Sequence, residues 1–328
     1  MPTERARTTD LGFGITAVDT DYVRPLLDAS HLLVHNGRGA FVDTGANSSV
    51  ACLLEALDRV SLDPADVDYV FLTHVHLDHA GGAGLLMQAL PNARAVIHPR
   101  GARHMADPAR LIAGSKAVYG EERFDQLYGE ILPIDDARIV IADDEATFDL
   151  GGRTLKTLHT EGHARHHYCL HDPYSEGVFT GDSFGISYRE LDTAAGEFVY
   201  PTTTPVHFDP VAAHEAIDRI LSLAPSRLYL THFSLVTDVA RLGADMHRRI
   251  DGFVALAEGD PGTGDGDRTE RLQEAMYAYL IAEARAHGVA LDESSLRDVL
   301  SMDVTLNVMG LEHWLDNRPE PGSLSKTH

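Results

Sequence analysis

The chain has 328 residues, of which 44% are hydrophobic and 23% charged, values that are ordinary for a globular protein with a sizeable core. Its 27 basic and 50 acidic side chains give a net charge of −23, which argues against a nucleic-acid partner. No apolar run approaches the ~18 residues needed to span a membrane, and no apolar signal region follows the N-terminus. We therefore expect a cytoplasmic protein with no membrane contact.

Predicted strands and helices alternate through the first 235 residues, a pattern typical of an α/β fold. Short apolar segments bounded by turn residues predict the strands 11–18, 31–43, 69–73, 96–97, 139–141, 147–150, 154–158, 167–170, 178–180 and 227–231. Apolar residues at helical spacing predict the helices 48–60, 81–90, 210–223 and 235–258. Residues 99–130 favour short helices, and residues 186–208 read as a long loop.

The C-terminal part of the chain differs in composition and in its predicted elements. Residues 258–267 are acidic and glycine-rich, which indicates a flexible linker, and two or three helices are predicted after them. We therefore predict a catalytic domain over residues 1–257, a linker over 258–267 and a helical extension over 268–328. The extension packs either on the core or on a second subunit of a homodimer.

A dense group of metal-binding residue types follows the predicted strand 69–73. Three histidines and one aspartate fall within six positions: His74, His76, Asp78 and His79. Side chains at i and i+2 of an extended segment point to the same side, so His74 and His76 can bind one metal ion together. The turn before Gly81 carries Asp78 and His79 towards a neighbouring position. One short loop can therefore supply ligands to two metal ions.

Three later residues have the character of the missing ligands. His163 follows a glycine after the strand 154–158, Asp182 follows a glycine after the strand 178–180, and His232 follows the strand 227–231. Sites in sheet proteins are commonly built from loops at one edge of the strands. We therefore predict that these side chains converge with the histidine cluster on one rim.

The ordered set His-x-His-x-Asp-His, His163, Asp182 and His232 resembles the metallo-β-lactamase superfamily in its glyoxalase II-like metal pattern. The resemblance covers about residues 11–235 and includes the early segment Asp43-Thr44-Gly45. It implies a four-layer αββα sandwich with the helical extension appended. It also implies two metal sites, which we assign to His74, His76 and His163 and to Asp78, His79 and His232, with Asp182 bridging them.

The resemblance also implies a chemistry. Two divalent ions, zinc in the first place with iron and manganese as alternatives, would supply a hydroxide for attack on a small-molecule ester, thioester, lactone or amide. Asp78 would act as a catalytic residue by orienting the water or moving its proton. The alternative is an iron-dependent oxidoreductase on the same fold, either similar to persulfide dioxygenases or to oxygen-binding diiron proteins.

Four further residues are predicted around this centre. Asp43 is expected to hold a ligating imidazole through its second nitrogen, on the strength of its place in the family motif. His166 is expected to line the pocket or support a ligand. Tyr188 and His207, in the long loop, are expected to bind substrate; packing of the loop against the core is the other interpretation.

Overall fold

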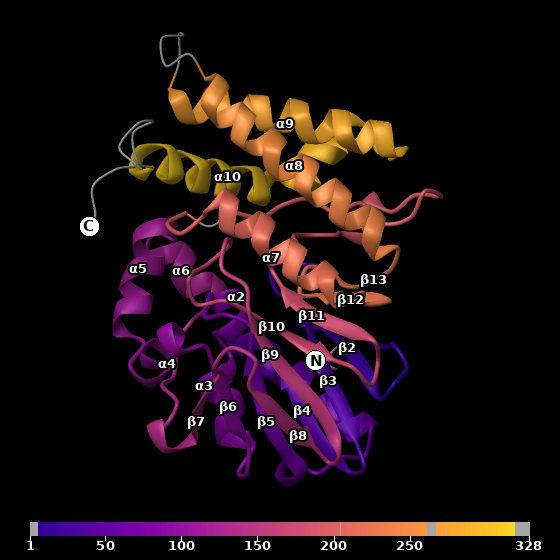
Figure 1. Ribbon diagram of the computed structural model, residues 1–328. Coiled ribbons are helices and arrows are strands. Elements are labelled where there is room, and N and C mark those ends of the chain that lie inside the picture. Colours follow the sequence, from indigo (N-terminus) through magenta and orange to yellow (C-terminus); the bar gives the residue numbers. More distant parts are fainter. Residues whose placement is uncertain (1–5, 204, 261–266, 319–328) are drawn as a thin grey trace, which may run out of the picture.

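The computed structural model describes residues 6–203, 205–260 and 267–318, which form two β-sheets packed face to face with helices on both outer sides (Figure 1). The first sheet has seven strands in sequence order. These are β1 (Thr8–Asp10), β2 (Ile15–Asp19), β3 (Ala29–His35), β4 (Arg38–Val42), β5 (Val67–Leu72), β6 (Arg94–Ile97) and β7 (Ile139–Ile141). The pairs from β1 to β4 are antiparallel, and those from β4 to β7 are parallel.

The second sheet has six strands in the order β13-β12-β11-β10-β9-β8. They are β8 (Thr147–Leu150), β9 (Arg153–His159), β10 (Tyr168–Asp172), β11 (Gly177–Gly181), β12 (Arg227–Leu230) and β13 (Ser234–Val236). Only the pair β11–β12 is parallel among these strands.

Alternation along the strands sorts the apolar side chains into layers. Leu33 and Phe71 of the first sheet pack against Phe179 of the second, which forms the layer between the sheets. Their neighbours in sequence, Leu32 and Val70, point to the opposite side and pack under helices. A one-residue shift in register would turn each set to the wrong face, so this pattern holds the two sheets in place.

The helices cover both outer faces. The first sheet packs against α1 (Val50–Arg59) and α3 (Ala83–Ala89), and the second packs against α7 (Pro210–Ser222) and α8 (Val239–Gly259). The order helix, sheet, sheet, helix confirms the predicted four-layer sandwich. Three short helices lie between β6 and β7, namely α4 (Pro99–Ala106), α5 (Ala109–Tyr119) and α6 (Glu121–Leu127), as the sequence predicted for 99–130.

Two long C-terminal helices, α9 (Arg268–His287) and α10 (Glu293–Asn317), lie beside α8 at the top of Figure 1. Their apolar side chains, Leu272 and Met276 of α9 and Leu300 of α10 among them, share one buried cluster with Phe253 of α8. Among the residues that the structure describes, each helix is too short or too polar to traverse a lipid bilayer.

Several elements differ from the predictions; for example, the predicted strand 31–43 is divided between β3 and β4. The short strand β13 precedes α8, so this helix begins at Val239 and not at residue 235. The three residues of β13 include a serine and lack the continuous apolar run that predicted the equally short β7, so β13 depends on its antiparallel pairing with β12. The strand β1 was missed for the same reason. Helix α8 also continues to Gly259, which places the first two residues of the predicted linker in a helix, while 261–266 lie outside the described residues.

Candidate metal centre

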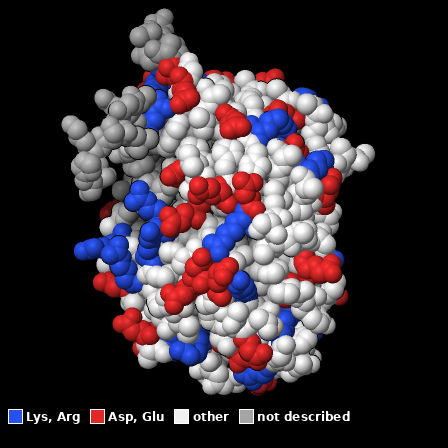
Figure 2. Space-filling model, viewed as in Figure 1, with Lys and Arg blue, Asp and Glu red and all other residues white. Residues whose placement is uncertain are grey.

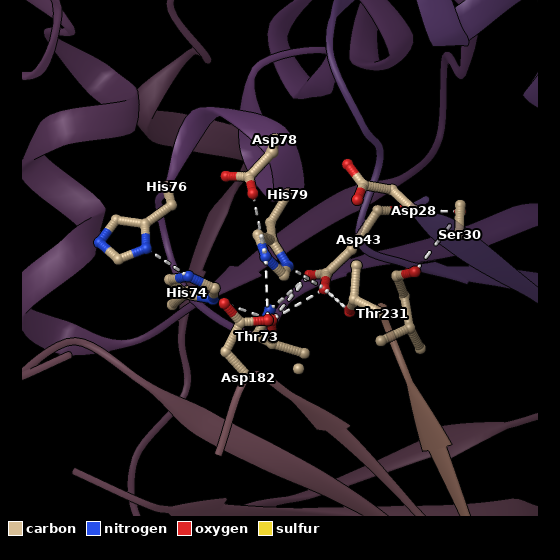
Figure 3. Close-up of polar contacts among 12 residues, drawn as sticks. Asp28, Ser30, Asp43, Thr73, His74, His76, Asp78, His79, Asp182 and Thr231 are labelled. Atoms are coloured by element: carbon tan, nitrogen blue, oxygen red, sulfur yellow. Dashed lines mark hydrogen bonds and ion pairs between the residues drawn. The ribbon is translucent and has the colours of Figure 1, made fainter. Parts of the chain in front are cut away.

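Seven side chains from four loops converge at one edge of the sandwich. Figure 3 shows His74, His76, Asp78, His79 and Asp182 among them. The loops follow β5, β9, β11 and β12, and one of them contains the short helix α2 (Leu77–Ala80). Three overlapping groups have all their ligand atoms within 4.8 Å of one another: His74 with His76 and His163, His74 with His79 and Asp182, and Asp78 with His79 and His232. The side chains predicted from separate strand ends are thus neighbours in space.

The first group brings three imidazole nitrogens together. Nε2 of His74 lies 2.7 Å from Nδ1 of His76, and Nε2 of His163 lies 3.2 Å from the same Nδ1. Nitrogen lone pairs this close repel one another unless a proton or a cation lies between them. Ligand atoms about 2.0–2.1 Å from a tetrahedral zinc ion lie roughly 3.3 Å apart, so the spacing suits a shared metal ion.

A second group, formed by His79, His232, Asp78 and Asp182, joins two imidazoles to two carboxylates. Oδ1 of Asp182 lies 3.2 Å from Nε2 of His79 and 3.3 Å from Nε2 of His232. Oδ2 of Asp78 lies 3.7 and 3.8 Å from the same two nitrogens. The other oxygen of Asp182, Oδ2, lies 3.2 Å from Nε2 of His163 in the first group. One carboxylate therefore faces both groups, each through a different oxygen.

Two buried atoms at the centre support a cation at this place. Nε2 of His79 and Oδ1 of Asp182 have no hydrogen-bond partner among the described residues. A buried polar atom without a partner costs about 1–3 kcal/mol, which a bound cation would offset. The donors are nitrogen and oxygen without cysteine sulfur, a set that suits zinc, iron or manganese. The residues present therefore fit a pair of divalent ions.

The position of Asp182 depends on the glycine before it. Gly181 has φ +48°, and a Cβ there would lie 2.6 Å from Nε2 of His167 and 2.6 Å from Oγ1 of Thr73. The backbone N–H of Asp182 donates to Nε2 of His167 over 3.2 Å. His167, which was not among the predicted site residues, thus holds Asp182 through its backbone.

Asp43, which we expected to hold a ligating imidazole, lies behind His79 (Figure 3). Its Oδ2 is 2.8 Å from Nδ1 of His79 and accepts a hydrogen bond from Thr231 over 2.8 Å, while its Oδ1 accepts one from the backbone N–H of Thr73 over 2.9 Å. This contact orients the ring and leaves its Nε2 for the centre. The φ of +57° at Asp43 is a conformation that Asp and Asn adopt more readily than most residues.

Asp28 has the corresponding role at His232, and the sequence analysis missed it. Oδ1 of Asp28 lies 2.6 Å from Nδ1 of His232, and the Leu27 carbonyl lies 3.2 Å from the same nitrogen. Asp28 stands at the end of a loop with no motif around it, so no local signal marks it. The third support is a backbone group: the carbonyl of Thr202 lies 3.1 Å from Nδ1 of His163.

Burial and charge act in opposite directions on these groups. Burial, assisted by neighbouring imidazoles, holds the pKa values of His74 and His76 well below the ordinary value, so both rings are neutral. Burial also disfavours charge on His79, but the carboxylates of Asp182, Asp78 and Asp43 outweigh it and raise the pKa of His79 well above its usual range. Burial disfavours ionisation of Asp182, yet His79, His232 and His163 together hold its pKa far below the ordinary value.

A cavity of about 290 Å³ opens onto both groups. His166 and His207 both line it. The expected contact of His207 with substrate stays a prediction. The ring of His166 is only 8% exposed and stacks beside that of His74, with a centroid distance of 6.1 Å. Tyr188, predicted to bind substrate, is absent from the described lining: its ring is buried and its hydroxyl donates to Oδ1 of Asp303 over 3.2 Å. The other interpretation of this loop residue, packing, describes its position.

Helix α10 supplies part of the cavity wall and anchors the loop beside it. Asp303 accepts hydrogen bonds from Tyr188 and, over 2.9 Å, from Tyr200. Oδ1 of Asn307 accepts one from the backbone N–H of Thr203 over 2.6 Å. Thr203 adjoins Thr202, whose carbonyl meets His163. The C-terminal extension therefore contacts the metal centre through one loop.

Asp303 leads to a prediction about stability. Burial raises the pKa of Asp303 from 3.8 to about 6, although its two tyrosine partners act in the opposite direction. The folded protein binds this proton more tightly than the unfolded chain does, so protonation of Asp303 stabilises the fold. Its contribution to the free energy of unfolding is complete below pH 3.8 and is lost as the pH rises through about 6. The free energy of unfolding of Asp303→Asn, taken relative to that of the natural protein, should therefore rise by up to about 3 kcal/mol from about pH 4 to about pH 8. Urea unfolding at both pH values measures this difference, and a constant difference would contradict the prediction.

Comparison with known proteins agrees with this geometry. The sequence profile of the Metallo-beta-lactamase superfamily matches residues 24–232. The metallo-β-lactamase fold-containing protein ST1585 of Sulfurisphaera tokodaii is 29% identical over 200 residues, which are 60% of this chain and 69% of that protein. The crystal structure of ST1585 has a TM-score of 0.62 and 21% identity, covering 95% of this chain and 99% of that one.

Two other relatives are named for their reactions. The N-acyl homoserine lactonase AttM of Azorhizobium caulinodans is 32% identical over 109 residues, which are 33% of this chain and 36% of AttM. The atrochrysone carboxyl ACP thioesterase of Aspergillus fumigatus is 27% identical over 155 residues, which are 47% of this chain and 36% of that enzyme. Since the superfamily profile spans more than half of the sequence, the chain belongs to the metallo-β-lactamase superfamily.

Proposed function

We propose that this protein is a metal-dependent hydrolase that cleaves a carbonyl ester, thioester, lactone or amide of a small molecule. One observation carries the proposal: the two oxygens of Asp182 face two separate groups of imidazoles at the floor of a cavity. A lactonase and a thioesterase among the relatives support this choice of reaction. Both reactions add water across an acyl bond and yield an acid and an alcohol or a thiol.

Two divalent cations, when bound, would lower the pKa of a water molecule towards neutrality and polarise the substrate carbonyl. The side chains of the protein would provide proton transfer, charge balance and orientation of the ligands. Asp78 lines the cavity, so its carboxylate can take the proton of the attacking water and pass it to the leaving group. Asp182, ionised and only 6% exposed, balances positive charge between the two groups. Asp43 and Asp28 keep two of the rings in one orientation.

The identity of the metal is part of the proposal. We propose zinc because five of the seven ligands are imidazoles, which are common zinc ligands, whereas manganese favours oxygen ligands. Iron and manganese are the alternatives, and elemental analysis of the purified protein separates the three. Oxygen consumption by an iron-loaded protein that hydrolyses none of the acyl substrates would favour the oxidoreductase alternative.

Removal of metal gives a direct test. Dialysis against a chelator should abolish hydrolysis of a panel of lactones and thioesters, because the remaining side chains cannot ionise water at neutral pH. The helix and sheet content, measured by circular dichroism, should persist because the apolar layers do not include the centre. Return of Zn²⁺ should restore the rate. Full activity in protein shown to be metal-free would overturn the proposed function.

A further inference from the structure

The acidic and basic side chains that line the cavity are unevenly distributed. Among the described residues of the lining, the carboxylates are Asp78, Asp182 and Asp303. The first two belong to the metal centre, and the third is held by two tyrosine hydroxyls. The lining contains one arginine among its described residues, Arg110 in the first turn of α5. Carboxylates therefore surround the reactive end, and a guanidinium lies on the wall supplied by α5.

Arg110 has no counterion among the residues that the structure describes. Within the described parts of the chain, its guanidinium makes no ion pair and no hydrogen bond, although the protein carries a net charge of −23. Two cations on neighbouring segments are paired: Arg100 lies 2.7 Å from Glu161, and Lys116 lies 3.7 Å from Asp125. Because Arg110 is both exposed and part of the lining, it lies where the cavity meets solvent.

The surroundings of Arg110 are also basic. Burial lowers the pKa of His104, another lining residue, and Arg103 and Arg110 lower it further. Burial also lowers the pKa of His207, a further lining residue, and the charge of Arg165 lowers it further. Basic side chains gather at the left edge of Figure 2, over the position of α5 in Figure 1. This edge thus attracts anions on a protein that is acidic overall.

Apolar side chains form much of the remaining wall. Leu111 and Val118 come from α5, Met302 and Leu306 from α10, and Val206 from the loop after β11. A ligand that reaches from the metal centre to Arg110 therefore passes an apolar surface before it meets the cation.

We propose that the substrate carries an anionic group, a carboxylate or a phosphate, that Arg110 binds while an apolar segment links this group to the scissile carbonyl. A guanidinium can bind either anion through two parallel hydrogen bonds, which a neutral chain end cannot form. Arg110 is thus a specificity-determining residue for the acyl substrate. This inference rests on the proposed hydrolysis, and its test separates the two.

The test uses matched p-nitrophenyl esters whose acyl chains, about six to ten carbons long, end in a carboxylate, a phosphate or a methyl group. For the metal-loaded natural protein, kcat/KM should be roughly tenfold higher for an anionic ester than for its methyl counterpart. The comparison of carboxylate with phosphate identifies the preferred anion. The preference should shrink when salt is raised from about 0.05 to about 0.5 M, because the cation is exposed.

Two variants locate the effect. In Arg110→Gln, the ratio of kcat/KM for the anionic and methyl esters should fall about tenfold, mainly through KM for the anionic ester. Arg110→Lys should keep part of the preference because it retains the charge but not the two parallel donors. Arg94→Gln is the matched control: Arg94 is exposed and unpaired among the described residues, and the cavity lining does not include it. It should leave the ratio unchanged.

The outcomes that overturn each proposal differ. Equal rates for the methyl and anionic esters, or the same ratio in the natural protein and Arg110→Gln, would overturn the anion site and leave the hydrolase intact. If no ester is cleaved, the hydrolase proposal fails for esters. Calorimetry with the non-hydrolysable ether analogue of the anionic ester then still tests the site. Roughly tenfold weaker binding to Arg110→Gln than to Arg94→Gln supports the site, and equal binding overturns it.

Discussion

Asp182→Asn is expected to lower kcat/KM for acyl hydrolysis by at least about 10³-fold and to lower the metal content of the purified protein. The reason is the position of its two oxygens, which lie 3.2 Å from His79 on one side and 3.2 Å from His163 on the other. An amide keeps the volume of the side chain but carries no charge, so it cannot balance positive charge in both groups. Elemental analysis and steady-state kinetics on the same preparation measure the two effects.

The control for this variant is Asp298→Asn, an exposed aspartate on α10 outside the cavity lining. It removes the same charge and should change neither metal content nor rate. Circular dichroism of both variants establishes that the fold is retained. Normal turnover with full metal content in Asp182→Asn would show that this carboxylate does not bind metal, and the proposed centre would then be wrong.

Asp43→Ala is expected to lower kcat/KM roughly 10–100-fold although Asp43 contacts no substrate. The substitution removes the acceptor for Nδ1 of His79 and leaves the donors of Thr73 and Thr231 without their partner. Because these groups are buried, we also expect a loss of about 3 kcal/mol in the free energy of unfolding. Asp43→Asn should recover part of the rate, since asparagine tolerates the positive φ and offers one acceptor oxygen.

A control variant at a second buried aspartate distinguishes a loss of stability from a loss of ring orientation. Asp172 is fully buried at the far end of β10, where it forms an ion pair with Arg153. Asp172→Ala should destabilise the fold by a similar amount yet keep the metal content and the rate at a temperature where the variant is folded. If Asp43→Ala resembled Asp172→Ala in all three measurements, Asp43 would have a structural role only.

Much of the fold followed from local patterns. Apolar segments of the right length predicted most strands of both sheets, because alternation and turn residues act over a few neighbours. The strands that were missed, β1 and β13, are short, lack a continuous apolar run and depend on the strands with which they pair. Stability that comes from a partner far along the chain leaves no periodic pattern in the segment itself.

The sequence by itself determined which side chains meet at the centre, because a histidine or aspartate placed directly after a strand is carried to the same edge as the ends of its neighbours. Only the tertiary structure decided what surrounds them. Asp28, the carbonyl of Thr202, the cation at Arg110 and the wall from α10 reach the site through contacts between distant segments. The tertiary structure also places Tyr188 in the core and not in the cavity lining. The physical reason is that packing between layers depends on the whole fold, whereas a ligand motif at a strand end depends on a few consecutive residues.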